Sequence, residues 1–268
     1  MILNDRGRFV VSTYIQNFLK FRPLLNELVA RDVKIKYRRS VLGVLWTLLN
    51  PLLMMIVLSV VFSNLFKFDV ENFSIYLLSG QVIFNFYSDA TNTSMTSILG
   101  SASLIKKVYV PKYLFVMSRI SSSVINLLAS FSALILVMVA TRVELHYTVF
   151  IVFVPIILLI VFSFGVGLLL AAIAVKFRDV MHLYSVFITA LMYLTPVIYP
   201  MSILPNWLSI IVKANPLTNY LTMFRNLMMY NMLFDVKSLV IGILEAAVAL
   251  VIGLYIFYRN QDTFILNL

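Results

Sequence analysis

Residues 147–175 read YTVFIVFVPIILLIVFSFGVGLLLAAIAV and contain no Asp, Glu, Lys or Arg. A helix needs about 20 mostly apolar residues to cross roughly 30 Å of hydrocarbon, so this stretch is long enough to span a bilayer. Residues 44–66 and 120–141 are also free of charged side chains. With 62% hydrophobic and 12% charged residues, the chain has the composition of a protein whose solvent is lipid.

Three further apolar stretches are less uniform. One of them carries a single charge, Asp89, and another carries Glu245. The third is uncharged but is broken by prolines, so we predict a helix that ends near Tyr199. The predicted fold is an all-α polytopic membrane protein, one membrane domain over residues 1–268, with six transmembrane helices at about 44–66, 74–98, 114–140, 148–175, 182–199 and 237–258.

Basic residues are concentrated on one side of the predicted spans. Six spans place four segments on one side of the membrane, and these segments hold most of the Lys and Arg. They are residues 1–43, the loops around 100–113 and 176–181, and the tail after 258. The positive-inside rule predicts that this side, with both termini, is cytosolic. This topology explains the net charge of +10, and without a basic soluble domain interleaved with aromatics we expect no nucleic-acid partner.

The absence of certain residue types excludes several kinds of site. Without cysteine there are no disulfides and no thiolate metal sites. No Gly-x-x-x-x-Gly-Lys-Ser/Thr loop is present, and His146 and His182 fall near opposite membrane faces, so we expect no nucleotide, metal or other cofactor on this chain. Residues 1–19 lack the apolar core of a cleavable signal peptide, so we expect the first span to act as the insertion signal.

An amphipathic segment precedes the first span. In residues 21–40, one helical stripe is charged and the opposing arc is apolar, which is typical of a helix that lies in the membrane interface. The stripe comprises Glu27, Arg31, Lys34 and Arg38, and the arc comprises Phe21, Leu24, Leu25, Leu28 and Ile35. Periodicity alone supports equally a topogenic basic segment and a docking surface for a cytosolic partner.

Two other segments are expected to form short helices outside the regular spans. In residues 101–110, Ser101 or Ser103 can cap a helix of about two turns, although the composition also fits an ordinary basic loop. Residues 201–235 are apolar yet interrupted by prolines. We predict two short re-entrant helices there, dipping into the outer face, because irregular backbone at membrane depth must be buried in protein or line a wet cavity.

The second span carries a polar stripe. Its members lie within about a quarter of the helix circumference and should avoid lipid, because a charge in hydrocarbon costs about 2.5–3.5 kcal/mol. The stripe consists of Gln81, Asn85, Ser88, Asp89, Asn92 and Thr96. We favour a hydrated conduit for it over hydrogen bonding between helices. A second stripe, which includes Phe84 and Tyr87, is aromatic and equally suits core packing.

Two further features of the later spans are a row of small residues and a single carboxyl group. Ser163, Gly167 and Ala171 recur at every fourth residue of the fourth span and predict a close helix contact. Glu245 has no partner that the sequence reveals. No cluster of convergent polar groups suggests a membrane-embedded enzyme, so transport is the predicted class of function.

Five segments together resemble the permease subunits of type-two ABC exporters for polysaccharides, the family of O-antigen, capsule and teichoic acid export permeases. The longest is RDVKIKYRRSVLGVLW at 31–46, followed by NP at 50–51. The others are LIKKVYVP at 104–111, FRDV at 177–180, TPVIYP at 195–200 and NPL at 215–217. The resemblance covers nearly the whole chain in order.

The resemblance implies a homodimer in a bacterial cytoplasmic (inner) membrane that exports a lipid-linked glycan with two ATPase subunits, which bind the ATP and Mg. It makes residues 21–40 an interface helix and residues 101–110 a coupling helix that touch the ATPase. The implied coupling residues are Arg31, Asp32, Tyr37, Arg38, Leu104, Ile105, Lys106, Lys107, Arg178 and Asp179. The implied gate residues are Pro196, Tyr199, Trp207, Asn215 and Pro216.

Family members carry aromatic residues along the conduit, and by position we assign that role to Phe84 and Tyr87. Two alternatives remain open at this point. One is an ABC permease for a drug or small lipid, against which the segment at 31–51 argues. The other is a stand-alone channel or ion-coupled transporter, which would move solute without an ATPase.

Overall fold

The computed structural model describes residues 3–37, 40–65, 72–144 and 146–267, and its regular elements are all helices, with no strand among these residues. The all-α prediction is therefore confirmed for this part of the chain. The helices are α1 (Leu3–Tyr37), α2 (Trp46–Leu65), α3 (Phe73–Met95), α4 (Ser97–Gly100), α5 (Ala102–Ile105), α6 (Tyr113–Ala140), α7 (Phe153–Lys176), α8 (Val180–Tyr193), α9 (Asn206–Ala214), α10 (Pro216–Met228), α11 (Val236–Asn260) and α12 (Phe264–Asn267). Short 3-10 turns occur at Gly43–Leu45, Tyr147–Ile151, Met201–Ile203 and Gln261–Thr263.

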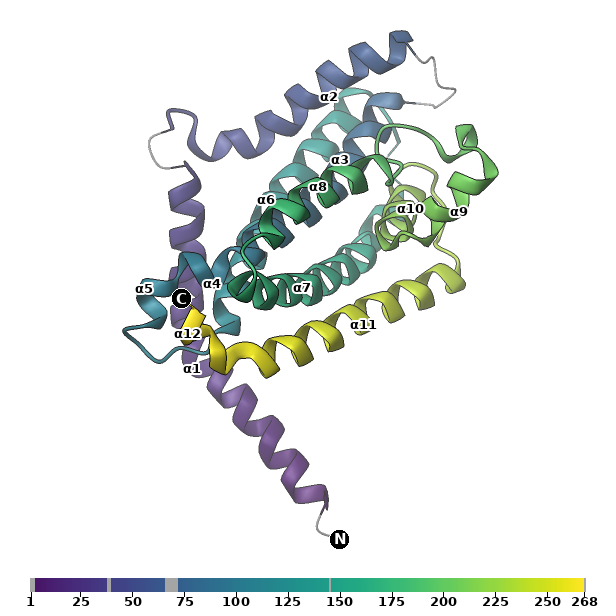
Figure 1. The fold of residues 1–268 in the computed structure, drawn as a ribbon. Coiled ribbons are helices and arrows are strands. Elements are labelled where there is room, and N and C mark those ends of the chain that lie inside the picture. Colours follow the sequence, from purple (N-terminus) through teal and green to yellow (C-terminus); the bar gives the residue numbers. More distant parts are fainter. Residues whose placement is uncertain (1–2, 38–39, 66–71, 145, 268) are drawn as a thin grey trace.

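Membrane-spanning character is clear for three helical segments of the described chain. Tyr113–Ala140, Tyr147–Lys176 and Val236–Thr263 are long and apolar enough to cross a bilayer. Trp46–Val61 and Val180–Tyr193 are apolar but shorter. α3 is too polar for this group, and the structure shows why it tolerates polar residues: it runs through the middle of the bundle, packed against α2, α6, α7 and α10 (Figure 1).

The elements gather at two opposite ends of the bundle (Figure 1). α5, α12 and the turn between α7 and α8 lie at one end, and the C-terminal half of α1 packs there. α9 and α10 lie at the other end. The basic residues Lys106, Lys107 and Arg178 are all exposed at the first end, so the described basic loops gather on one side of the bundle.

α1 is longer than the predicted interface helix at 21–40, because it extends over 35 residues and its N-terminal part projects beyond the bundle (Figure 1). Leu25 and Leu28 on its second half are 7% and 4% exposed and pack in an apolar cluster with Ile105 and Phe115. Four residues of the apolar arc expected from the sequence therefore pack within the protein, with Phe21 and Leu24 beside this cluster, whereas the fifth, Ile35, is 60% exposed.

Helix contacts through small residues connect α7 to two neighbours. A Cβ on Gly253 of α11 would overlap the carbonyl group of Gly165 on α7, so these two backbones touch. A Cβ on Gly167 would lie 2.9 Å from the side chain of Ser94 on α3. The predicted small-residue face of α7 therefore packs on α3, while Gly165, which lies off that face, sets the contact with α11.

Candidate functional site

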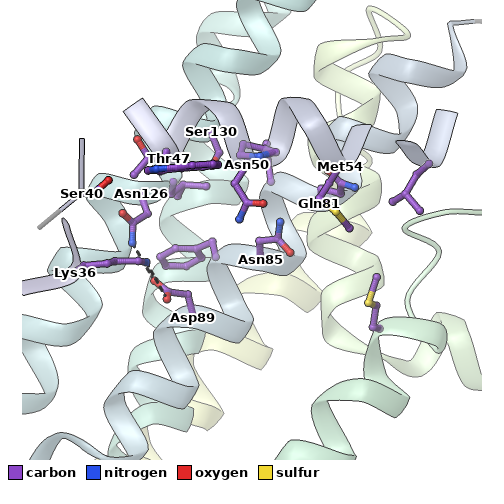
Figure 2. A pocket seen from close by; sticks show the side chains of 17 residues that line it. Lys36, Ser40, Thr47, Asn50, Met54, Gln81, Asn85, Asp89, Asn126 and Ser130 are labelled. Atoms are coloured by element: carbon purple, nitrogen blue, oxygen red, sulfur yellow. Dashed lines mark hydrogen bonds and ion pairs between the residues drawn. The ribbon is translucent and has the colours of Figure 1, made fainter. Parts of the chain in front are cut away.

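A cavity of about 610 Å³ lies between α2 on one side and α3 and α6 on the other (Figure 2). Three members of the predicted polar stripe, Gln81, Asn85 and Asp89, line it from α3. Thr47 and Asn50 line it from α2, so amide and hydroxyl groups face each other across the space. A hollow with this lining can hydrogen-bond a polar, uncharged solute or water inside an otherwise apolar protein.

The other three members of the stripe lie elsewhere. Ser88, Asn92 and Thr96 do not line the cavity. The Asn92 amide donates to the Ser88 carbonyl oxygen at 2.9 Å, and the Thr96 hydroxyl donates to the Thr93 carbonyl oxygen at 3.2 Å. These side chains therefore bond within their own helix, and the structure brings only Gln81, Asn85 and Asp89 of the stripe into one space.

Asp89 is the most connected polar residue of the cavity. Its Oδ2 accepts hydrogen bonds from Ser123 Oγ at 2.7 Å and from Asn126 Nδ2 at 3.1 Å, both on α6. Its Oδ1 forms an ion pair with Lys36 Nζ of α1 at 3.3 Å, at the rim of the cavity (Figure 2). The carboxylate thus joins α1, α3 and α6, which explains how a charge is tolerated on a buried helix.

Gln81 lies at the other end of the cavity lining on α3. Its side chain is buried, and its Oε1 has no hydrogen-bond partner among the described residues. A buried amide oxygen without a partner is costly, and because this oxygen is itself shielded, the amide would have to turn to meet water or a solute in the cavity.

The aromatic residues assigned by position to the conduit are core residues in this structure. Phe84 and Tyr87 are 6% and 4% exposed and belong to the main apolar cluster. The Tyr87 ring stacks on Phe162 of α7 with 5.9 Å between centroids. Neither residue lines the cavity, and both belong to the apolar core instead.

Asp32, one of the predicted coupling residues, is directed into the bundle. Its carboxylate is buried and forms ion pairs with Arg119 on α6 at 3.2 Å and with the neighbouring Arg31 at 3.0 Å, and it accepts a hydrogen bond from Ser118 Oγ at 3.3 Å. Arg31 stays partly exposed. Arg38 lies outside the described residues, and of Tyr37 only the backbone, at the end of α1, is described.

The predicted coupling helix is shorter than expected, since α5 has only four residues and Ser101 makes no side-chain cap. Ile105 is buried in the cluster with α1, and Leu104 packs beside that cluster. The residues that protrude are Lys106, Lys107, Val108 and Tyr109, the last of which is 92% exposed. Arg178 and Asp179 are exposed in the turn between α7 and α8 at the same end.

Four of the five predicted gate residues meet at the opposite end. Asn215 caps α10 by accepting from the Leu217 backbone N–H at 3.0 Å, and its amide donates to Thr195 Oγ1 at 2.9 Å. Pro216 occupies the first turn of α10, which suits its missing N–H. Pro196 and Tyr199 lie in the non-helical segment between α8 and the next 3-10 turn, whereas Trp207 on α9 is 66% exposed.

Arg225 on α10 joins this group although the sequence did not single it out. It is buried, and it donates to the carbonyl oxygens of Pro196 at 2.7 Å and Val197 at 3.0 Å. The available signal was a lone basic residue inside a mostly apolar segment, but its acceptors are backbone carbonyls that no sequence pattern identifies.

The sequence that builds these sites also matches known proteins. Residues 23–229 match the sequence profile of ABC-2 type transporters. The chain belongs to the ABC-2 type transporter family. The matched part of this ABC-2 transporter runs from the second half of α1 to the end of α10 and so contains the cavity, α5 and the Arg225 site.

Relatives of this ABC-2 transporter extend the match beyond that region. The chain is 26% identical to the O-antigen export system permease protein RfbA of Klebsiella pneumoniae over 90% of its own length and 93% of the relative's. It is 28% identical to the protein of the same name from Myxococcus xanthus, over 93% and 97%. With the capsule polysaccharide export inner-membrane protein CtrC of Neisseria meningitidis it shares 22% identity over 80% and 82%.

Proposed function

We propose that this ABC-2 transporter is the permease subunit of an exporter that moves a lipid-linked surface polysaccharide across a bacterial cytoplasmic (inner) membrane. The observation that carries the proposal is the alignment of nearly the whole chain with O-antigen export permeases from two organisms. A relative that is an inner-membrane protein of capsule export supports both the location and the class of substrate.

The cavity supports a glycan as the substrate. A long polymer offers many hydroxyl groups and little charge, and it must pass without being bound tightly at any one unit. Asn50, Asn85 and Gln81 present amide groups that can exchange hydrogen bonds with successive hydroxyls. Apolar residues such as Trp46, Met54 and Phe86 also line the cavity and give sugar rings an apolar surface between these amides.

The energy source in this proposal is a separate subunit. No phosphate-binding loop occurs in the sequence, so two ATPase subunits would bind ATP and Mg, and the permease itself would catalyse nothing and hold no cofactor. The exposed residues Lys106, Lys107, Tyr109 and Arg178 at the basic end form the contact surface for these subunits. This end, with both termini, is then cytosolic, as the positive-inside rule requires.

A second copy of the chain completes the path. The cavity lies at the edge of the protomer, between α2 and the central helix α3, rather than within the apolar cluster. α8 buries only Tyr184 among its residues, so most of its surface also remains available. We infer that two protomers enclose the conduit between them, with α9 and α10 as re-entrant helices at the outer mouth.

The test is a deletion of this gene in its native host, complemented by the native chain. We expect loss of the surface polysaccharide and accumulation of the lipid-linked polymer on the cytosolic side, both reversed by complementation. A deletion strain that keeps its surface polysaccharide but loses export of a drug or small lipid would contradict the proposal.

A further inference from the structure

Arg225 is buried at 5% exposure on α10 and uses three of its nitrogen atoms at once. Nη1 donates to the Pro196 carbonyl oxygen at 2.7 Å, and Nη2 donates to the carbonyl oxygens of Tyr76 at 2.9 Å and Val197 at 3.0 Å. Nε donates to Ser79 Oγ at 3.1 Å. One side chain therefore ties α10, α3 and the segment after α8 together.

No carboxylate is paired with Arg225 in the part of the chain that the structure describes. Its charge is balanced instead by backbone dipoles and by the ring of Tyr76, whose centroid lies 3.5 Å from the guanidinium carbon. Only Arg presents several N–H groups in a fixed planar fork, and a Lys could reach one or two of these acceptors. The site is thus built for a guanidinium group.

Two of the carbonyl groups to which Arg225 donates, those of Pro196 and Val197, lie in the irregular segment that follows α8, and the third, of Tyr76, belongs to α3. α8 ends at Tyr193, and Pro196 and Pro200 prevent the chain from continuing as a helix. The Tyr76 hydroxyl serves the same segment, donating to the Tyr199 carbonyl oxygen at 2.9 Å. Residues 194–200 are therefore held in place by the side chains of Arg225, Tyr76 and Asn215 and not by regular secondary structure.

The close approach of this segment to α3 depends on a glycine. A Cβ on Gly80 would lie 2.7 Å from Nη2 of Arg225 and 2.9 Å from the Val197 carbonyl oxygen. Gly80 immediately precedes Gln81, which lines the cavity, and Met192 of α8 lines it as well. Residues 194–200 do not line the cavity themselves, but they contact α3 at Gly80, next to Gln81, and follow Met192 of α8, which both line it.

We propose that Arg225 is a positioning residue that holds residues 194–200 against α3 and so seals the cavity from the outer side in the resting state. The inference deepens the proposed function by naming the contact that keeps the outer mouth closed. Weakening this contact should let the segment leave α3 and admit water and small ions from outside, with no ATP required.

The test uses accessibility of a single cysteine, because the native chain has none. The cysteine replaces Asn85, which lines the cavity and is exposed to it, in right-side-out membrane vesicles of the full chain. The probe is a membrane-impermeant trimethylammonium methanethiosulfonate added outside, without ATP. In the parent N85C protein we expect slow labelling, because residues 194–200 close the outer side.

Arg225→Gln should speed this labelling by about tenfold or more, because a closed state that loses the hydrogen bonds from Arg225 to Pro196 and Val197 loses population to the open state. Arg225→Lys should give an intermediate rate, since it keeps the charge but not the fork. Lys213→Gln is the matched control, because it removes an exposed cation from the neighbouring α9 and should leave the rate unchanged.

Tyr76→Phe is the second variant, which removes one hydroxyl and its bond to Tyr199 while keeping the ring under Arg225. We expect a smaller increase in labelling than for Arg225→Gln. If Arg225→Gln fails to insert into the membrane, the labelling rate of Tyr76→Phe tests the proposal instead. Unchanged labelling in the inserted variants would overturn the proposal. The assay needs no glycan, so its failure is separate from failure of the export function.

Discussion

Lys36 on α1 and Asp89 on α3, which are 53 positions apart in the chain, form an ion pair of 3.3 Å between Nζ and Oδ1 at the rim of the cavity. The pair connects α1, the proposed interface helix, with α3, which lines the polar space. Asp89 also accepts hydrogen bonds from Ser123 and Asn126 on α6, so replacing Asp89 and replacing Lys36 should change the stability by different amounts.

Lys36→Ala should lower the stability of the protein by less than about 1 kcal/mol, because the ion pair is largely exposed to solvent. Asp89→Ala should lower it by roughly 1–3 kcal/mol, because the donors Ser123 and Asn126 then lose their acceptor. Thermal unfolding of the purified protein in detergent measures both. Lys34→Ala, on the exposed side of α1, is the control, and equal effects of both variants would contradict the assignment.

The ion pair between Asp32 on α1 and Arg119 on α6, whose carboxylate is buried, predicts a larger effect. Asp32→Ala should cost about 3–5 kcal/mol, because it leaves Arg119 without its buried partner. Glu27→Ala removes an exposed carboxylate from α1 and should be nearly neutral. If the two variants unfold at the same temperature, Asp32 does not fasten α1 to α6.

The protruding residues after α5 should carry part of the contact with the ATPase. Reversing Lys106 and Lys107 to Glu should weaken capture of the ATPase subunit by about tenfold, because rim charges set electrostatic complementarity. The control reverses Lys213 and Lys237, which are exposed toward the opposite end. Copurification at several salt concentrations measures the effect, and equal capture by both double variants would place the contact elsewhere.

Ile105 should behave differently from those lysines. Because its side chain is 7% exposed and packs with Leu25 and Leu28, Ile105→Asp should destabilise the permease itself by burying a charge. The expected result is a lower unfolding temperature in the absence of any ATPase. A variant that unfolds normally but no longer binds the ATPase would instead show that Ile105 belongs to the intersubunit contact.

Several features were predictable because they are properties of a single helix. The charge-free stretches predicted the apolar helices, and the spacing of Gln81, Asn85 and Asp89 placed these residues on one face that does line a polar space. The apolar arc of residues 21–40 likewise predicted a packed face, although periodicity did not say whether the packing partner was the chain itself.

Other features depend on which element lies opposite, and the sequence carries no signal for that. Phe84 and Tyr87 are as compatible with a conduit as with a core until α7 is placed beside them. Gly165 contacts α11 because of the way α7 and α11 cross. The regular spacing of Ser163, Gly167 and Ala171 predicted a contact on a different face of α7. Arg225 binds backbone carbonyls, which every residue possesses, so its partners leave no pattern.

In the proposed mechanism, the glycan passes through the cavity between α2 and α3. The most direct measurement places a photo-crosslinking amino acid at Asn85, which lines the cavity, and at Val248, which is 55% exposed on α11. Illumination during active export, followed by detection of polymer attached to the permease, should give glycan adducts at position 85 and none at position 248. Adducts at 248 with none at 85 would contradict the account.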